Sequence, residues 1–406
     1  MKRNLFISNP YVIFSSLWVI VLLLYSLDWS NLYPVLSTKL TLFLVGTITV
    51  TSICGYFTWR RKTFEVYFIE NTSRYYPVLR KYVRWILILM VLDIIYSGYI
   101  PLVVYMNGPS NSSTYLDFGM PFVHIIVVNG CSLLFNCSFW LYRNSDSSKM
   151  KKSFLKLCGL CTLQPLLCYS RAQLLFMILG ALYIILISNK NVKKTLFRIG
   201  ISSIIILYLF GLAGDFRQSG GGENYFVKIA GANDKFYRTK IPTAFFWGYI
   251  YISSPLANVQ NMINTRRHVN PRKEGLENLI YNHMLPGIIK RRLNVEGTYP
   301  ALTDDTSYLI VEELNVGGIY YGAYGAYKWT GMLIIFLYYL LIVGFSMQMI
   351  PYNSILRLPA IVALILITFM QIFNNPFAGD GFIPHLIIAI VLARLSQFRT
   401  LHYKNE

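Results

Sequence analysis

Two arginines of this 406-residue chain stand at the ends of apolar segments, where a guanidinium could meet an anion. Arg171 follows the turn QPLLCYS between two apolar runs, and Arg217 follows a third run in the stretch GDFRQSGGG. A guanidinium fork binds phosphate oxygens with two N–H groups at once. We therefore predict that Arg171 and Arg217 share a pyrophosphate site. For Arg171 the alternative is snorkelling, in which the charge reaches the membrane surface without a ligand.

A second group of basic residues lies in one long polar segment, residues 214–313. We expect one or two of them at most to touch a ligand, while the others face solvent or lipid headgroups; they are Arg266, Arg267, Lys290, Arg291 and Arg292. We select Arg291 as the third pyrophosphate-binding residue.

Acid–base chemistry would need a carboxylate or a histidine beside that site. The same segment offers Asp305, Glu312 and His283 as candidate general bases, although no local motif singles out any of them. The sequence contains no cluster of oxygen or nitrogen ligands suited to a divalent cation, so we expect neither a metal nor another cofactor.

Aromatic residues in the long segment could stack on sugar rings. Trp247 and Tyr251 lie in FFWGYIYISSPLAN, and Tyr299 lies further on, near interleaved carboxylates. The apolar part of FFWGYIYISSPLAN is too short to cross a bilayer, so we expect an interfacial or re-entrant helix that walls a groove for a lipid-linked substrate. The alternative is an ordinary aromatic belt at the membrane interface.

The elements that must hold these residues are membrane spans. Hydrophobic residues make up 55% of the chain, and ten apolar runs approach the ~20 residues that a transmembrane helix needs. The runs are residues 11–27, 35–59, 85–106, 121–142, 154–170, 172–188, 196–213, 325–350, 359–373 and 383–401. The fold expected is an all-α polytopic membrane protein with ten transmembrane helices, or twelve if residues 241–256 and 308–324 also cross.

Three regions follow from this pattern. Residues 1–213 would carry transmembrane helices 1 to 7, and residues 214–324 would form one large external loop with short amphipathic helices. Residues 325–406 would carry helices 8 to 10 and the C-terminus. One carboxylate, Asp93, falls inside the third run, where it is either functional or hydrogen-bonded to a neighbouring helix.

The formal net charge of +19 is distributed by loop. Lys and Arg cluster in alternate loops, against only Lys39 and Arg171 at the short turns on the other side. The positive-inside rule then places both termini in the cytoplasm and the long segment outside. Because the charge sorts by loop, it indicates membrane topology, and we expect no nucleic-acid partner.

Four sequence stretches, together with this layout of spans and loops, resemble those of a known protein family. SRAQLL (Arg171 and Leu175), GDFRQ (Arg217), FFWGYIYISSPLAN and AYGAYKWTGMLIIFLYYLL resemble the Wzy-type O-antigen polymerases of bacterial inner membranes. The resemblance implies a metal-independent glycosyltransferase with a GT-C-like fold. It would polymerise oligosaccharide repeat units linked to undecaprenyl pyrophosphate at the periplasmic face. Arg171 and Arg217 would then stabilise the leaving pyrophosphate.

The same resemblance implies the partners. They are the undecaprenyl-pyrophosphate-linked oligosaccharide, membrane lipids, and a chain-length regulator and flippase of the same lipopolysaccharide pathway. Two other functions stay open: an O-antigen ligase or related lipid-linked glycan transferase, and a flippase or other transporter. A transporter would place its polar residues near the bilayer midplane, and there the sequence has little besides Asp93.

Overall fold

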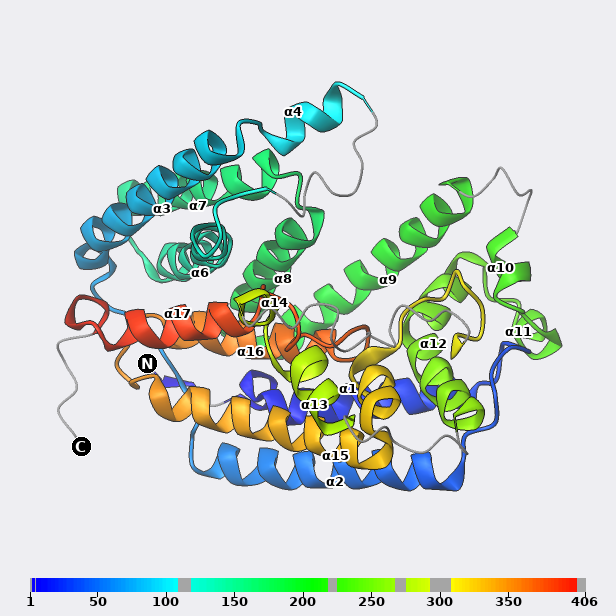
Figure 1. Ribbon diagram of the computed structural model, residues 1–406. Coiled ribbons are helices and arrows are strands. Elements are labelled where there is room, and N and C mark those ends of the chain that lie inside the picture. The colour runs from blue at the N-terminus through cyan, green and yellow to red at the C-terminus, as the bar shows by residue number, and fades with distance from the viewer. Residues whose placement is uncertain are drawn as a thin grey trace.

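The computed structural model describes residues 2–3, 5–108, 118–217, 225–266, 275–292 and 308–399. Helices form 75% of the chain, and sheet is almost absent from the described residues (Figure 1). The first half contains α1 (Pro10–Ser26), α2 (Thr38–Arg60), α3 (Tyr76–Ser97), α4 (Pro101–Met106), α6 (Val123–Asn144), α7 (Ser148–Leu167), α8 (Arg171–Ser188) and α9 (Val192–Arg217). Short 3-10 helices lie at Phe6–Ser8 (η1) and Thr72–Tyr75 (η2), and β1 (Lys2–Arg3) pairs with β2 (Val66–Tyr67) in an antiparallel ribbon.

The second half begins with shorter helices and ends with long apolar ones. These are α10 (Tyr225–Ile229), α11 (Asp234–Arg238), α12 (Ala244–Thr265), α13 (Gly275–Leu279), the π-helical turn η4 (Ile280–Met284), α14 (Gly287–Arg292), α15 (Gly318–Met349), α16 (Arg357–Met370), α17 (Ile383–Arg394) and the 3-10 helix η7 (Ser396–Phe398).

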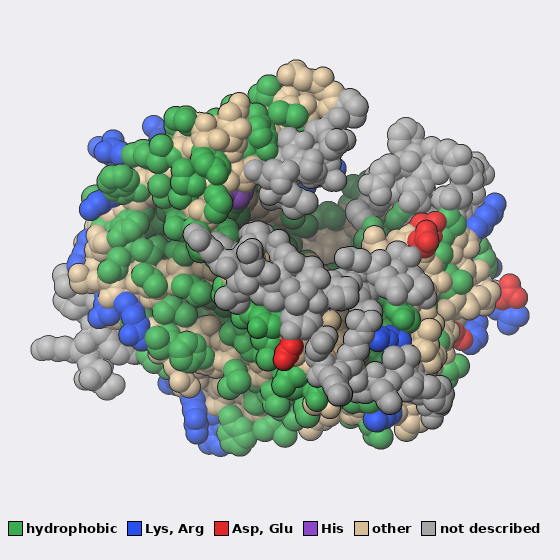
Figure 2. Space-filling view, viewed as in Figure 1, with side chains coloured by type: hydrophobic (Ala, Val, Ile, Leu, Met, Phe, Trp, Pro, Cys, Tyr) green, Lys and Arg blue, Asp and Glu red, His purple; other side chains and the backbone are tan. Residues whose placement is uncertain are grey.

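Four of the described helices, α2, α6, α8 and α15, are long and apolar enough to cross a membrane. Shorter apolar helices are α1, α16 and α17. Large aliphatic side chains are exposed on several of these helices, including Leu42, Ile178 and Leu341. Hydrophobic side chains cover much of the face seen in Figure 2. Exposed apolar surface of this extent indicates contact with lipid, so the chain is an all-α protein with the surface of a membrane protein.

The core forms where α1 packs along α15 and α16. Apolar side chains recur every three or four residues of α1, so Phe14 and Trp18 lie on one helical face. Phe14 stacks on Tyr339 with ring centroids 5.0 Å apart, and Trp18 contacts Tyr320 at 5.1 Å. All four rings are buried. This seam fixes α15 against the N-terminal helix over much of its length.

Polar contacts gather the loops at one end of the helices. The buried Arg357 guanidinium donates hydrogen bonds to the backbone carbonyls of Thr63, Glu65 and Ile350. A β-bridge joins Ser354 to Arg399. The loop after α2, the loop after α15 and the end of the described chain therefore meet.

Another set of loops meets at the opposite end. Ser30 Oγ donates to the carbonyl of Ala230 at 2.7 Å, and Lys235 forms an ion pair with Asp28. The N–H of Gly318 donates to the carbonyl of Phe373 at 3.1 Å. The loop after α1 is thus tied to the segment that precedes α12, and the turn after α16 is tied to the start of α15.

Two boundaries differ from the sequence prediction. The third apolar run, expected at 85–106, is α3 from Tyr76 followed by the separate short helix α4. The break between them falls at Gly98, which has a positive φ of 73° and caps α3. The re-entry expected at residue 325 begins at Gly318 instead, and the helix that follows is kinked.

The expected interfacial helix is an interior helix. α12 extends over 22 residues, most of them buried, and it packs against α1, α9 and α15. Its buried polar side chains include Ser253, Asn258 and Gln260. Asn258 Nδ2 donates to the carbonyls of Leu314 and Val316, and its Oδ1 accepts from the N–H of Ile310. α12 is therefore the element on which the segment before α15 is ordered.

Candidate functional site

A basic site lies where α12 ends and α15 bends. Arg266 is the C-cap residue of α12. Lys328 lies in the kink of α15, with φ 55° and ψ −143°, beside Tyr327, which is also non-helical. A non-glycine residue with this backbone conformation is strained, and such strain concentrates at functional sites. We call Arg266 and Lys328 the basic junction.

The Arg266 side chain is held rigidly. It is only 6% exposed, and its Nη1 donates a 2.8 Å hydrogen bond to the carbonyl of Gly325. The guanidinium lies over the ring of Tyr308, 5.5 Å from the ring centroid. Its Nε is buried and has no hydrogen-bond partner among the described residues. A buried donor without a partner is costly and calls for an explanation.

Lys328 lies against Arg266. Its Nζ donates to the backbone carbonyl of Arg266 and is 5.5 Å from the centroid of the Tyr324 ring. Lys39 adds a third positive charge nearby, because its Nζ lies 4.7 Å from the ring of Trp329, the residue after Lys328. Tyr324 and Trp329 contact each other edge to face. Each of the three cations thus lies against an aromatic ring.

No carboxylate among the described residues forms an ion pair with the basic junction. Within the described ranges, the ion pairs are Asp93 with His124 and Lys235 with Asp28, and neither involves Arg266 or Lys328. Backbone carbonyls at two helix ends accept from Arg266 Nη1 and Lys328 Nζ, which is an ordinary capping role. Capping leaves Arg266 Nε unexplained. A bound anion would satisfy that donor and neutralise both charges.

Neighbouring amides position the junction. Asn261 Nδ2 donates to the carbonyl of Tyr308 at 2.9 Å, which places this ring below the Arg266 guanidinium. One turn earlier, Asn258 holds the chain from Ile310 to Val316. Polar residues on one face of α12 therefore order the segment that supplies an aromatic wall of the site.

Arg171 and Arg217 do not come together in the structure. α8 and α9 diverge from the short connection between them, so the first turn of α8 and the last turn of α9 lie apart (Figure 1). Arg171 is exposed and donates to the hydroxyl of Tyr169, and the Tyr169 ring stacks on Tyr105 with centroids 4.2 Å apart. The side chain of Arg217 lies outside the described part. The two helix turns that carry the predicted shared site therefore lie apart.

The third predicted pyrophosphate residue and two of the other candidates cannot be placed. Arg291 belongs to α14, and its side chain is not among those described. Asp305 and Tyr299 lie outside the described residues.

The two described candidate bases, His283 and Glu312, differ sharply in their exposure to solvent. His283 is 4% exposed, and burial, with a smaller contribution from the positive charge of Lys290, lowers its pKa to about 4. Because the imidazole is buried, an acceptor hydroxyl cannot reach it without a rearrangement, so the structure argues against His283 as the base. Glu312 is exposed in a turn before α15, at the same end of the molecule as the basic junction.

The two described residues of the predicted aromatic groove, Trp247 and Tyr251, also differ in exposure. Trp247 is 2% exposed within α12 and cannot line an open groove, which corrects that prediction. Its ring stacks at 6.1 Å on Tyr251, which is 40% exposed. The physical reason is that α12 is surrounded by protein, so only part of its aromatic face reaches the surface.

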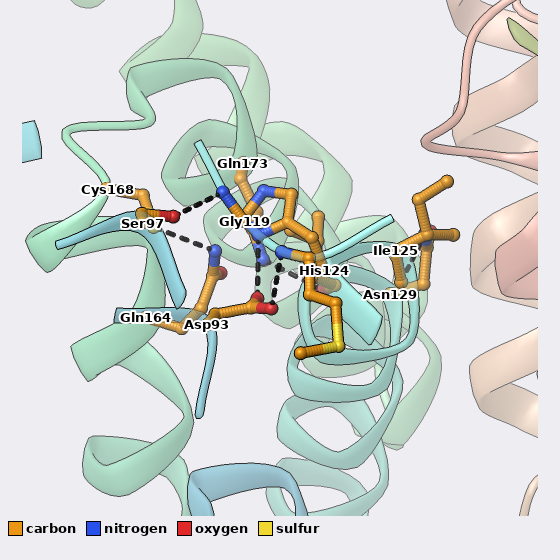
Figure 3. A network of polar contacts seen from close by, with 11 residues as sticks. Asp93, Ser97, Gly119, His124, Ile125, Asn129, Gln164, Cys168 and Gln173 are labelled. Carbon is orange, nitrogen blue, oxygen red and sulfur yellow. Dashed lines mark hydrogen bonds and ion pairs between the residues drawn. The ribbon is translucent and has the colours of Figure 1, made fainter. Parts of the chain in front are cut away.

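Asp93 belongs to a structural network (Figure 3). Its carboxylate is 1% exposed and accepts from His124 Nδ1 at 2.9 Å and from the N–H of Met120 at 3.1 Å. Ser97 Oγ accepts from the N–H of Gly119 at 2.8 Å. The network ties the end of α3 to the start of α6. The hydrogen-bonded alternative for Asp93 is therefore confirmed.

Sequence reasoning missed Lys328. The signal was present in AYGAYKWTGM, where one lysine interrupts an aromatic and apolar stretch that re-enters the membrane. Comparisons with protein-family models, with curated proteins and with solved structures found no match to this chain.

Proposed function

We propose that this chain is a Wzy-type O-antigen polymerase, a metal-independent glycosyltransferase of the bacterial inner membrane. It joins undecaprenyl-pyrophosphate-linked repeat units into O-antigen polysaccharide at the periplasmic face. The observation that carries the proposal is the buried Nε of Arg266 beside Lys328, which has no hydrogen-bond partner among the described residues. A pyrophosphate supplies the oxygens that this site lacks, and the four sequence stretches quoted above point to the same substrate.

The reaction needs a fixed positive charge more than it needs a cofactor. An acceptor hydroxyl oxygen attacks the anomeric carbon of the donor sugar, and the bond from that carbon to the lipid pyrophosphate breaks. The leaving pyrophosphate takes the electron pair, so negative charge grows on its oxygens. Arg266 and Lys328, which hydrogen bonds and aromatic rings hold in place, would stabilise that charge and lower the barrier. The hydroxyl proton passes to a carboxylate base, for which Asp305 and Glu312 remain the candidates.

The membrane arrangement of the proposal uses ten crossings: α1, α2, α3, α6, α7, α8, α9, α15, α16 and α17. The basic loops around Arg357 then lie in the cytoplasm with both termini, and the basic junction lies at the periplasmic end. Two observations support this arrangement: the loops on either side of α2 gather at opposite ends of the molecule, and Lys and Arg alternate by loop.

The test uses cells lacking this gene, complemented with the wild type or with Arg266→Gln, Lys328→Gln or Arg238→Gln. Arg238 is exposed in α11 and serves as the matched control for charge removal. We expect long-chain lipopolysaccharide with the wild type and Arg238→Gln. With the other two variants we expect mostly single-repeat product at equal membrane abundance.

Three results would contradict the proposal in different ways. Long chains in the deletion strain would remove the polymerase function. Full ladders from both Arg266→Gln and Lys328→Gln would remove the basic junction as the site. A deletion strain with no glycan at all on the lipid core would indicate ligation or flipping instead.

A further inference from the structure

A partly enclosed pocket lies between α6, α8, α16 and the start of α17, away from the basic junction. Its volume is about 190 Å³. The described residues that line it include none of Asp, Glu, Lys or Arg; the side chains that matter here are Asn136, Gln173, Phe176, Phe382 and His385. This lining favours an uncharged ligand.

Three residues that line this pocket each carry a polar atom with no hydrogen-bond partner among the described residues. The atoms are Asn136 Oδ1, Gln173 Oε1 and His385 Nε2. The three side chains are 3%, 6% and 6% exposed, so bulk water does not satisfy them. Gln173 Nε2 donates to the carbonyl of Val128 and to Ser132 Oγ, which fixes the amide with its oxygen free. Buried polar atoms in native proteins are normally paired.

The unpaired atoms and the walls specify the ligand together. Two amide oxygens need donors, and the imidazole nitrogen can pair with a hydroxyl in either direction. The rings of Phe176 and Phe382 meet edge to face at 5.2 Å on the pocket wall. A hydroxyl-bearing ring offers donors on its edge and C–H groups on its faces. A lipid acyl chain would leave all three polar atoms unsatisfied.

The size agrees with a six-membered ring. A dry cavity of about 150 Å³ accepts benzene, and a single water needs only about 10–15 Å³. We propose that this pocket is a binding site for one neutral sugar ring, held by Asn136, Gln173 and His385. Because the pocket's own walls specify the ligand, the inference does not rest on the polymerase function.

A substitution at the mouth of the pocket can block ligand entry without changing the protein core. Ala172 and Gly381 line the pocket and are exposed, so Ala172→Phe narrows the opening without adding volume to the core. Gln173→Met keeps the side-chain length and removes the acceptor oxygen. Ile178 is 55% exposed on the same helix and is absent from the pocket lining, so Ile178→Phe is the matched control.

The experiment is saturation-transfer NMR on the purified full chain in lipid nanodiscs. The probes are free glucose, galactose, rhamnose and N-acetylglucosamine at millimolar concentration. We expect saturation transfer to at least one sugar with the wild type and with Ile178→Phe, and none with Ala172→Phe. Gln173→Met should weaken the apparent affinity about tenfold, the effect of one hydrogen bond. Inorganic phosphate should not compete.

Two results would overturn the assignment. One is the absence of transfer to every sugar with the wild type, which would leave only water in the pocket. The other is equal transfer with all four proteins, or competition by phosphate, which would place sugar binding elsewhere. Thermal unfolding of each variant separates loss of binding from loss of fold.

Discussion

The side-chain amino group of Lys328 donates a hydrogen bond to the backbone carbonyl of Arg266, so two cations are held against each other where α12 meets α15. Their described hydrogen-bond acceptors are carbonyls, which carry no net charge to cancel theirs. Two like charges this close repel each other unless an anion lies between or beside them. The interior packing of α12 and the aromatic rings around the site offset this electrostatic repulsion.

The planar guanidinium of Arg266 should contribute to the polymerisation rate in addition to its positive charge. Arg266→Lys retains one positive charge but removes the buried Nε and the planar pair of donors. We expect a loss of polymerisation rate of about 10²-fold, the usual effect of removing one donor to a developing oxyanion. The measurement is polymer formed from lipid-linked repeat units by the purified protein. Arg238→Lys is the control, and a rate for Arg266→Lys equal to the wild type would contradict the role of the fork.

The kink at Lys328 should reverse an ordinary helix preference. In a helix interior Ala is more stable than Gly by about 1 kcal/mol. At φ 55° and ψ −143° a Cβ is strained and glycine is not. Lys328→Gly should therefore unfold with a free energy about 1–2 kcal/mol higher than Lys328→Ala. Both variants lose the same charge, so both should lose activity. An alanine variant as stable as the glycine variant would show that the kink carries no strain.

The sequence located most of the helices but not the site. Apolar runs correspond to helices from α1 to α17 because lipid-facing and core-facing residues are both hydrophobic. α12 was misjudged because Asn258 and Gln260 lower its hydropathy, and their hydrogen bonds to distant segments exist only in the folded chain. Arg266 was one of five basic residues with nothing to rank them. Its burial, its unpartnered Nε and the bend at Lys328 are tertiary properties.

Arg171 should contribute less than Arg266. Its guanidinium is exposed, and it already donates to the hydroxyl of Tyr169. Water screens an exposed charge, so its effect on a distant leaving group is small. We expect Arg171→Ala to shorten the polymer while preserving polymerisation, measured by lipopolysaccharide banding at matched expression. Single-repeat product alone from Arg171→Ala would restore the predicted Arg171 site and shift the reaction toward α8.

The pH dependence of stability should reveal the buried His283. Its pKa is lowered from 6.5 to about 4, chiefly by burial and then by Lys290. Between these values the unfolded chain binds a proton that the folded chain does not, so the free energy of unfolding falls as the pH falls through this range.

From pH 8 to pH 5 the contribution of this one group is a loss of about 2 kcal/mol. His283→Gln removes the titration, so its free energy of unfolding should fall by about 2 kcal/mol less than that of the wild type over the same range. The measurement is equilibrium unfolding in mild detergent at both pH values. Equal losses for the two proteins would mean that His283 is protonated in the folded state. A protonated His283 would add a positive charge to this end of the molecule and reopen its assignment as an acid–base residue.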